Sequence, residues 1–333
     1  MNDDYLIMMK QKLMHIPNGE YEITNYSGDD NDSIISSSHI TLKSDVLCKG
    51  QMENYPPFPG IELIFYRLLG SNVFSHHKSF EHVIELNYCH EGSIEWTMNN
   101  GTTLYLGSGD LSIHTMSRCA NSALVFPMKY YDGVCITIDI NKINTKLPEI
   151  LKDAGVSGQN LYEKFCTPQK PFSLQNNKKV KQIFNDLYNS PENMKTAYYK
   201  LKVQELVIFL SSLDISEEKI INTHYDQQLK LIHEIHALLT QNLDQYFTIE
   251  ELSKRYFLNT SALKETFKTV YGSPIASYMK EYRMKSAMEL LRTTDYHISE
   301  IANNVGYQSQ SKFTAAFKNI TNILPSEYRK LNR

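Results

Sequence analysis

The sequence predicts an α+β protein with two parts, an N-terminal antiparallel β-sandwich or small barrel with following helices, and an all-helical C-terminal part. Three observations lead to this prediction. A chain of 333 residues is long enough for two domains. Short β-rich runs separated by turn residues fill residues 21–140. Beyond Asp139 the apolar residues recur at helical spacing.

Composition excludes several classes of protein. Hydrophobic residues make up 41% of the chain and charged residues 21%, which is typical of a folded globular protein and not of a disordered or collagen-like one. No apolar run reaches the roughly 18 residues of a membrane span. The first residues are acidic and lack the apolar stretch of a signal peptide, so we expect a cytoplasmic protein.

The cysteines predict reduced thiols. There are five, an odd number, and none forms a Cys-x-x-Cys pair: Cys48, Cys89, Cys119, Cys135 and Cys166. A disulfide framework or a zinc ribbon needs paired spacings, so neither is expected.

Charge is distributed unevenly along the chain. Residues 227–333 hold 14 Lys and Arg against 10 Asp and Glu, whereas the preceding residues hold 20 against 27. A basic segment attached to an acidic body suggests that the C-terminal part meets a polyanion and the N-terminal part does not.

The β-rich region contains six predicted strands, at residues 61–66, 83–89, 93–98, 102–106, 111–114 and 134–140. Asn99-Asn100-Gly101 predicts a tight hairpin between two of them. The aromatic residues Tyr88, Trp96, Tyr105, Phe126, Tyr130 and Tyr131 could line a ligand pocket or form the packed core of the barrel.

The helical region begins with a predicted helix over residues 194–213. Its apolar positions include Met194, Leu201 and Val207, and they cover more than one narrow stripe. It could pack on its own barrel, pair with a second copy of the chain, or do both. The polar residues 214–226 predict a linker, which gives domains at 1–213 and 227–333.

The C-terminal part contains an internal duplication. Ile249, Leu252 and Ser253 recur 49 positions later, and Leu263, Phe267, Lys268, Val270 and Tyr278 recur 50 positions later, with the extra residue Gln308 in the turn. The first copy predicts a helix opened by the capping box Thr248-x-x-Glu251, then a helix capped by Asn259. In the second copy a helix over residues 298–305 is followed by the turn residue Gly306 and a helix capped by Ser309.

Two short helices joined by a tight turn suggest a helix-turn-helix unit, whose second helix enters the major groove of DNA. A plain helical bundle without a DNA role is the alternative. Between the copies, Ile275, Met279, Ala287 and Leu291 predict one amphipathic connecting helix.

At these residues the sequence resembles the AraC/XylS family of bacterial transcription regulators. The resemblance lies in residues 298–302, 306–313, 316–318 and 325–329, with support from Tyr271-Gly272, Arg283 and residues 290–293. It covers about a hundred residues. It implies two helix-turn-helix units joined by one helix, double-stranded operator DNA as partner, and neither cofactor, metal nor catalytic residues.

The resemblance also implies a cupin-like N-terminal sensing domain, which matches more loosely. From it we expect an unidentified small-molecule effector, a homodimer, a role as activator of transcription, and RNA polymerase as a further partner. Asn322 stands where the family usually has glycine, and asparagine is the next best residue for a left-handed helix end.

The positions expected to meet DNA lie on the second helix of each copy: Ser261, Lys264, Glu265 and Lys268, then Gln310, Ser311, Lys312, Thr314 and Lys318. The lysines Lys268 and Lys318 are expected at phosphates, and the others face base edges. Arg283 on the connecting helix either contacts phosphate or forms an internal salt bridge. Glu265, where the family often has arginine, either accepts a hydrogen bond from a cytosine or pairs with Lys264 or Lys268.

Candidates for chemistry in the first domain are weaker. His76, His77, His82, His90 and His114, with Glu81 and Glu85, do not have metal-ligand spacing, and we expect surface or hydrogen-bonded histidines. A redox role for Cys89 or Cys119 is the alternative reading of the thiols. The sequence therefore predicts a DNA-binding regulator and not an enzyme. Two alternatives stay open: a metal-dependent cupin enzyme with a DNA-binding tail, and a constitutive DNA-binding dimer without a ligand.

Overall fold

The computed structural model describes residues 2–26, 34, 40–44, 48–167 and 171–332. Contacts between residues divide the chain into two compact units, Met1–Thr223 and His224–Arg333. The boundary falls inside one long helix, α8 (Ile215–Gln241), so the segment expected to be a linker is helical from residue 215 onward. None of the described helices is both long and apolar enough to cross a membrane.

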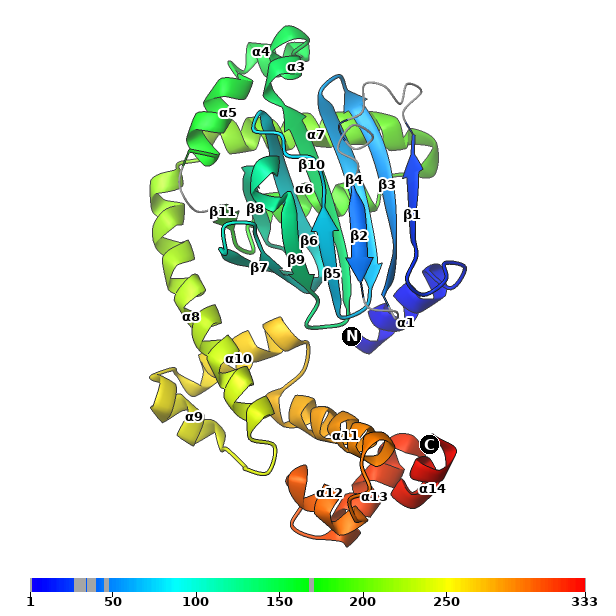
Figure 1. Cartoon of the computed structure of the whole chain (residues 1–333). Coiled ribbons are helices and arrows are strands. Elements are labelled where there is room, and N and C mark those ends of the chain that lie inside the picture. The colour runs from blue at the N-terminus through cyan, green and yellow to red at the C-terminus, as the bar shows by residue number, and fades with distance from the viewer. Residues whose placement is uncertain (1, 27–33, 35–39, 45–47, 168–170, 333) are drawn as a thin grey trace. The chain divides into compact units, whose positions relative to one another are not determined.

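The N-terminal unit is a nearly closed barrel of two sheets, which confirms the predicted fold class (Figure 1). The first sheet runs β1 (Tyr21–Asn25), β3 (Lys49–Phe58), β4 (Ile61–Leu69), β10 (Tyr130–Asp139), β6 (Val83–Thr97), β8 (Leu111–Thr115) and β11 (Phe172–Leu174). The second runs β2 (Thr41–Ser44), β5 (Asn72–His76), β9 (Asn121–Val125), β6 again and β7 (Thr103–Gly107). Among the described strands, β1 and β3 are parallel and the other pairs are antiparallel.

Strand β6 takes part in both sheets. Its first part pairs with β10 and β8, and residues 93–97 pair with β7 and β9. The register against β10 shifts between Asp132 and Gly133, which lie opposite Glu91 and Cys89, so His90 is the extra residue of a β-bulge. The sequence predicted two strands here, at 83–89 and 93–98. That prediction was wrong, because a bulge interrupts the alternation of side chains as a turn would.

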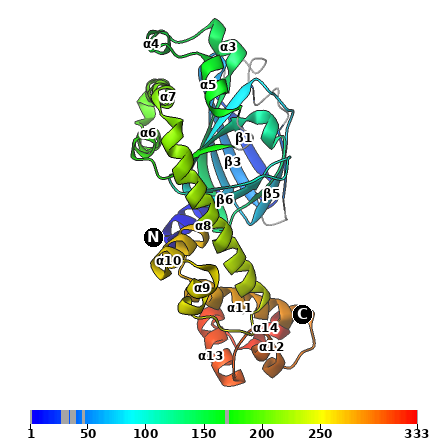
Figure 2. The ribbon, with the colours of Figure 1, turned by 90° about the vertical axis from the view of Figure 1, so that its left-hand side faces the viewer.

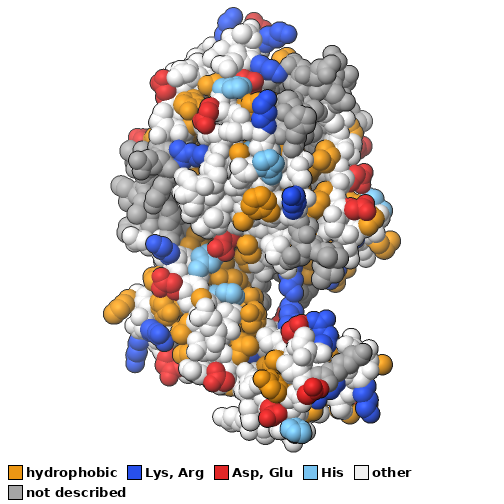
Figure 3. Space-filling model, in the orientation of Figure 1, with side chains coloured by type: hydrophobic (Ala, Val, Ile, Leu, Met, Phe, Trp, Pro, Cys, Tyr) orange, Lys and Arg blue, Asp and Glu red, His pale blue; other side chains and the backbone are white. Residues whose placement is uncertain are grey.

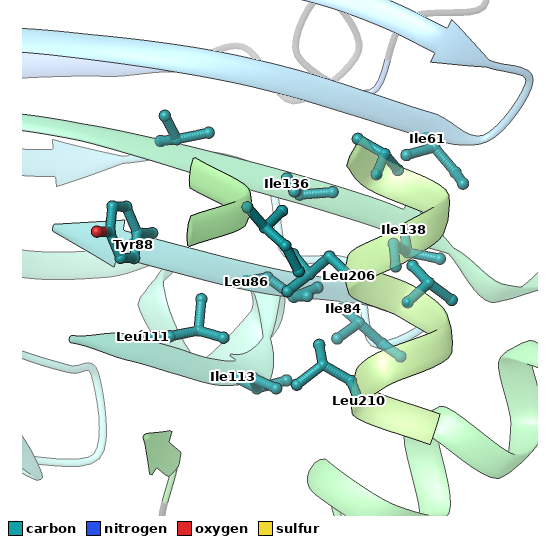
Figure 4. Packing of buried hydrophobic residues seen from close by; sticks show 14 of the residues in the cluster. Ile61, Ile84, Leu86, Tyr88, Leu111, Ile113, Ile136, Ile138, Leu206 and Leu210 are labelled. Atoms are coloured by element: carbon teal, nitrogen blue, oxygen red, sulfur yellow. The ribbon is translucent and has the colours of Figure 1, made fainter. Parts of the chain in front are cut away.

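Helices gather on one side of the barrel (Figure 2). They are α3 (Ile140–Thr145), α4 (Glu149–Asp153), α5 (Gly158–Phe165), α6 (Lys178–Tyr188) and α7 (Lys195–Ser212). Met9 of α1 (Asn2–Lys12) and Leu13, which follows the helix, pack against Tyr130. Figure 4 shows Leu206 and Leu210 of α7 pointing toward strand residues such as Leu86 and Ile113. Each such fully buried aliphatic side chain contributes about 1.5–3 kcal/mol, so this layer is a main source of the unit's stability.

The predicted helix at 194–213 is present as α7 (Lys195–Ser212), and it packs on its own barrel, one of the alternatives from the sequence. Val203, Leu206 and Leu210 are buried against the sheet, whereas Leu201 is 54% exposed. The buried residues follow the i, i+3, i+7 spacing of a single stripe, and Leu201 lies outside it.

The barrel interior is filled largely by its own side chains, among them Trp96, Phe126 and Tyr131. All six aromatic residues named from the sequence are buried. Not all of them face the interior, however. Tyr88 stacks on Phe184 of α6 with ring centroids 4.0 Å apart, on the helix-covered side of the sheet.

The C-terminal unit consists of helices, as predicted. After α8 come α9 (Ile249–Tyr256), α10 (Thr260–Tyr271), α11 (Ile275–Thr293), α12 (Ile298–Asn304), α13 (Gln310–Thr321) and α14 (Pro325–Leu331). Helices α9 and α10 form the first copy of the repeat, and α12 and α13 form the second. Helix α11 joins the two copies. In the second copy, Met284 and Leu291 of α11 pack against Ile301, Phe313 and Phe317.

Candidate nucleic-acid interface

In the first copy of the repeat, both helices begin with the capping residues that the sequence predicted. The Thr248 hydroxyl accepts a hydrogen bond from the Glu251 backbone N–H at 3.1 Å, and the Glu251 carboxylate accepts one from the Thr248 N–H at 2.7 Å. The Asn259 side chain accepts from the Ser261 N–H at 2.8 Å, which starts α10. These bonds satisfy backbone donors that a helix start otherwise leaves free.

The second copy starts its helices in the same way. The Glu300 carboxylate accepts a hydrogen bond from the His297 N–H at 2.6 Å at the start of α12. The Ser309 hydroxyl accepts from the Lys312 N–H at 3.3 Å and caps α13, as expected. Both copies therefore hold their second helix by a polar residue placed directly before it.

Left-handed backbone occurs at matching positions of the two copies. Phe257 (φ 53°) and Gly306 (φ 81°) occupy the turns, and they are 49 residues apart, the offset of the surrounding repeat. Gly272 (φ 80°) and Asn322 (φ 63°) end α10 and α13, and they are 50 residues apart. Asn322 thus replaces a glycine in the conformation that the sequence predicted for it.

We expect Phe257→Gly to stabilise the protein. A non-glycine residue in left-handed backbone costs roughly 1–2 kcal/mol, and Phe257 is 95% exposed, so its ring contributes little packing. After allowing for the greater freedom of glycine in the unfolded chain, the free energy of unfolding should rise by about 0.5–1 kcal/mol in chemical denaturation. Phe257→Ala removes the ring but keeps Cβ and is the control. Equal stability of the two variants would show that backbone strain is not relieved.

The residues predicted to contact DNA lie on the outer faces of α10 and α13. Eight are exposed and Thr314 is half-buried, the exposed ones being Ser261, Lys264, Glu265, Lys268, Gln310, Ser311, Lys312 and Lys318. The inner faces carry Phe267 and Phe317, which are fully buried. On the side seen in Figure 3, Lys and Arg side chains of the C-terminal helices are interspersed with Asp and Glu. Each second helix therefore presents a polar face to solvent.

Glu265 lies on this polar face. Within the part of the chain that the structure describes, its carboxylate forms no ion pair with Lys264 or Lys268, and its carbonyl oxygen accepts a hydrogen bond from the Thr269 hydroxyl at 2.9 Å. The intrahelical pair, one of the two alternatives from the sequence, is therefore not formed here. The carboxylate is available to an external partner.

Arg283 lies inside the unit and is 7% exposed. Its Nε donates to the Leu243 carbonyl oxygen at 3.1 Å, its Nη2 donates to the Gln245 carbonyl oxygen at 2.8 Å, and its guanidinium lies 4.0 Å from the centre of the Tyr246 ring. The prediction of a phosphate contact was wrong, because the group is buried. The alternative of a salt bridge was also wrong, because the partners are carbonyl oxygens. Arg283 instead fixes the loop between α8 and α9 onto α11.

Sequence reasoning missed His236, which lies at the centre of the first copy's aromatic core. Its ring stacks on Tyr271 with centroids 4.2 Å apart, and its Nε2 lies 2.9 Å from the Tyr278 hydroxyl. Burial lowers the pKa of His236 to about 4, with His233 adding to the effect, so the ring is neutral in the folded protein at pH 7. Its place on the apolar stripe of α8, four residues after the buried Ile232 and three before the buried Leu239, was the available signal.

The candidate histidines of the N-terminal unit do not converge on one site. His76 contacts Asn121, His82 lies 3.7 Å from Asp139, and His90 stacks on Tyr188. Glu81 accepts a hydrogen bond from Ser117. His77 and His114 are buried beside Glu85, a grouping that the spacing in the sequence did not predict.

All five cysteines are buried free thiols, as predicted. Burial raises the pKa of Cys89 and Cys119 well above the usual thiol value, and the nearby Asp110 and Glu85 carboxylates raise them further. Both are therefore protonated thiols, and the redox alternative, which needs an accessible thiolate, has no support in their surroundings.

Two helix-turn-helix units joined by one helix define a DNA-binding class of protein, and comparison with known proteins agrees. Residues 252–331 match the family model described as "Helix-turn-helix domain". The regulatory protein SoxS of Escherichia coli is 31% identical over 100 residues, which are 30% of this chain and 94% of SoxS. The chain therefore belongs to the AraC/XylS family of transcriptional regulators, as the sequence indicated.

Other relatives match over part of their length. The transcriptional activator RhaR of Yersinia pseudotuberculosis is 26% identical over 144 residues, 42% of this chain and 49% of RhaR. The chain spans 15% of the regulator YtdP of Bacillus subtilis. Among solved structures, the C-terminal domain of AraT, a response regulator from Geobacillus stearothermophilus, is 27% identical, with a TM-score of 0.29, over 30% of this chain and 84% of that one.

Proposed function

We propose that this protein is a sequence-specific transcriptional regulator that binds double-stranded operator DNA through α10 and α13. The observation that carries the proposal is the pair of matched helix-turn-helix units, each with a capped second helix whose outer face is polar and whose inner face is buried. In such units the second helix enters the major groove and its early residues face base edges. A protein that works on bacterial DNA acts in the cytoplasm.

Within this proposal the residues divide into two groups. Lys268 and Lys318 hold phosphates, because each lies in the last turn of its helix, away from the residues that enter the groove first. Ser261, Lys264 and Glu265, with the α13 residues Gln310, Ser311, Lys312 and Thr314, read bases.

We further propose that the N-terminal barrel senses a small-molecule effector, that the protein is a homodimer and that it activates transcription by contacting RNA polymerase. Family membership supports these roles, and RhaR is a relative named as an activator. The exposed side of α7, which includes Leu201, supports pairing with a second copy. Because a ligand stabilises the unit that it binds, a thermal-shift screen of the full chain tests for the effector.

Selection of binding sites from random DNA, with the full-length protein, tests the function. The proposal expects an operator with two conserved segments about one helical turn, 34 Å, apart, one for each unit. Failure to enrich any sequence, at a salt concentration where the protein still binds nonspecific DNA, would contradict it.

Removing either phosphate lysine should weaken binding to all DNA sequences equally. Lys268→Ala and Lys318→Ala are each expected to make the slope of log K against log salt shallower by about one unit, since one fewer counterion is released. The measurement is fluorescence anisotropy at several salt concentrations on the selected operator. Lys10→Ala, an exposed lysine on α1 in the N-terminal unit, makes the same charge change and should leave the slope unchanged.

Glu265→Ala should relax the preference at one operator position by roughly 1–3 kcal/mol, because a carboxylate accepting from a cytosine amine discriminates between bases. Its removal should also raise nonspecific affinity, since a charge that repels phosphate is lost. Glu250→Ala, at an exposed position on α9, should at most raise affinity without changing the preference. A selection logo that is the same for wild type and Glu265→Ala would end the base-reading assignment.

A further inference from the structure

The inner face of the barrel carries a buried row of ionisable and polar side chains. Strand register places His114, Glu85, Thr137 and Glu62 next to one another across β8, β6, β10 and β4. All four are buried, and their strand neighbours point the other way, toward the helices. Such a row is expensive to bury unless each group has a partner.

Two further residues meet this row at Glu85. Cys119, in the short 3₁₀ turn Met116–Cys119, has its Sγ 3.0 Å from Glu85 Oε2, and His77, directly after β5, has its Nε2 3.5 Å from the same sulfur. The three ligand atoms all lie within 4.8 Å of one another. A backbone hydrogen bond from the His77 N–H to the Ala120 carbonyl oxygen, 2.9 Å long, holds the two segments together.

The hydrogen bonds around this group leave the right atoms free to bind a cation. His77 Nδ1 lies 3.0 Å from the Lys78 carbonyl oxygen, which can only accept, so Nδ1 carries the proton and the lone pair of Nε2 faces Cys119 and Glu85. His114 differs, because its Nδ1 donates to the Thr115 carbonyl oxygen and its Nε2 lies 3.2 Å from Asn87 Nδ2. Both ring nitrogens of His114 therefore already have polar neighbours, and its Nδ1 also lies 3.9 Å from Glu85 Oε2.

The Glu85 carboxylate is buried with no cationic Lys or Arg side chain paired to it in the described part of the chain. Its partners are the Cys119 thiol and His114. Thr137 Oγ1, next to Glu85 in the register, is buried without a hydrogen-bond partner in the described chain. A thiolate and a carboxylate together carry two negative charges, which one divalent cation balances, and a neutral imidazole adds none.

We propose that His77, Glu85 and Cys119 bind a zinc ion, with water in the fourth position. Sulfur, imidazole nitrogen and carboxylate oxygen are the ligands that zinc takes in proteins, and around a tetrahedral ion they lie roughly 3.4–3.6 Å apart. The Cys119–His77 distance of 3.5 Å already fits this value, and the 3.0 Å hydrogen bond from Cys119 to Glu85 lengthens when its proton leaves. Binding forms the Zn–S bond, and the thiol proton is released to solvent.

The site does not depend on the proposed function, since DNA binding uses the other unit's residues. Its ligands come from three separate segments, around β5, on β6 and in the turn before β9, so zinc ties these segments together. We expect the metal-bound protein to unfold at a higher temperature than the metal-free protein.

The test uses full-length protein, freed of metal by a chelator and kept reduced without added thiols. Titration with Co²⁺ should reach one equivalent and give the near-ultraviolet absorption of a thiolate bound to cobalt, and Zn²⁺ should displace the cobalt. Cys119→Ser should abolish this absorption and weaken zinc binding by roughly 10–100-fold or more. Cys89→Ser, which changes another buried thiol, should behave like wild type.

The proposal would be overturned if wild type bound neither Co²⁺ nor Zn²⁺, or if Cys119→Ser bound them as tightly as wild type. His77, Glu85 and Cys119 would then be a buried hydrogen-bonded group without a metal. If Cys119→Ser fails to fold by circular dichroism, His77→Gln decides, because it removes the nitrogen ligand and keeps the thiol. This variant should still show the absorption of a thiolate bound to cobalt, but it should bind cobalt more weakly than wild type. Unchanged affinity in His77→Gln would equally exclude the site. Operator binding by the same preparations reports on the proposed function separately.

Discussion

Replacing Arg283 with methionine is expected to lower the free energy of unfolding of the C-terminal helices by about 3 kcal/mol or more. The change removes two charge-assisted hydrogen bonds, each worth roughly 1.5–3 kcal/mol, and the stacking on Tyr246. It also leaves the carbonyl oxygens of Leu243 and Gln245 without these donors. Hydrogen exchange of peptides from α9 to α12, in the full-length protein, would measure the loss.

The same variant separates a structural role from DNA contact. Because Arg283 does not reach phosphate, the salt dependence of operator binding should keep its slope while the protein loses stability. Arg292→Met, on the same helix but at an exposed position paired with Glu289, should change stability little. A shallower salt slope with unchanged hydrogen exchange in Arg283→Met would place the guanidinium on DNA and contradict the assignment.

Gly306→Ala is expected to destabilise the second copy by at least about 2 kcal/mol, which combines left-handed strain of roughly 1–2 kcal/mol with a steric clash. A Cβ at this position would lie 2.3 Å from the Leu243 carbonyl oxygen and 3.2 Å from Arg283 Nε. Since both neighbours belong to the contact that fixes the α8–α9 loop, the added methyl group cannot be accommodated by a side-chain rotation alone. Thermal and urea denaturation of the full-length protein would measure the effect.

Gly155→Ala is the matched control for this prediction. Gly155 also has left-handed backbone, φ 68°, but a Cβ there would meet nothing within 4 Å. It therefore reports the conformational strain without the clash. If Gly306→Ala lowered the free energy of unfolding no more than Gly155→Ala does, the steric clash with the Leu243 carbonyl oxygen would be contradicted.

The C-terminal unit could be predicted well from the sequence, because its signals are local. Thr248, Asn259 and Ser309 mark helix starts through hydrogen bonds to residues two or three positions away. The partners of Arg283 could not be predicted, since its hydrogen bonds reach backbone carbonyls about 40 residues earlier, and carbonyl groups leave no trace in residue types.

The barrel was harder to predict for a related reason. Because of the bulge at His90, the single strand β6 has the sequence pattern of two strands. The exposure of Leu201 depends on which stripe of α7 packs on the sheet, and this is a tertiary contact. Cys119 lies 34 residues from Glu85 and 42 from His77, so their meeting depends on the closure of the barrel and not on any local spacing.

The shared strand β6 has a consequence for how the barrel assembles. Because its first part completes one sheet and its last part completes the other, neither sheet can be finished while β6 is unpaired. Strand β7 follows β6 across a short hairpin, whereas β8, β9 and β10 lie further along the chain. Completing both sheets therefore closes longer loops, and this step is intrinsically slow. The two sheets should then form and melt as one cooperative unit. We therefore expect a substitution that weakens the pairing of residues 93–97 to lower the hydrogen-exchange protection of Val83 as well, at the other end of the same strand.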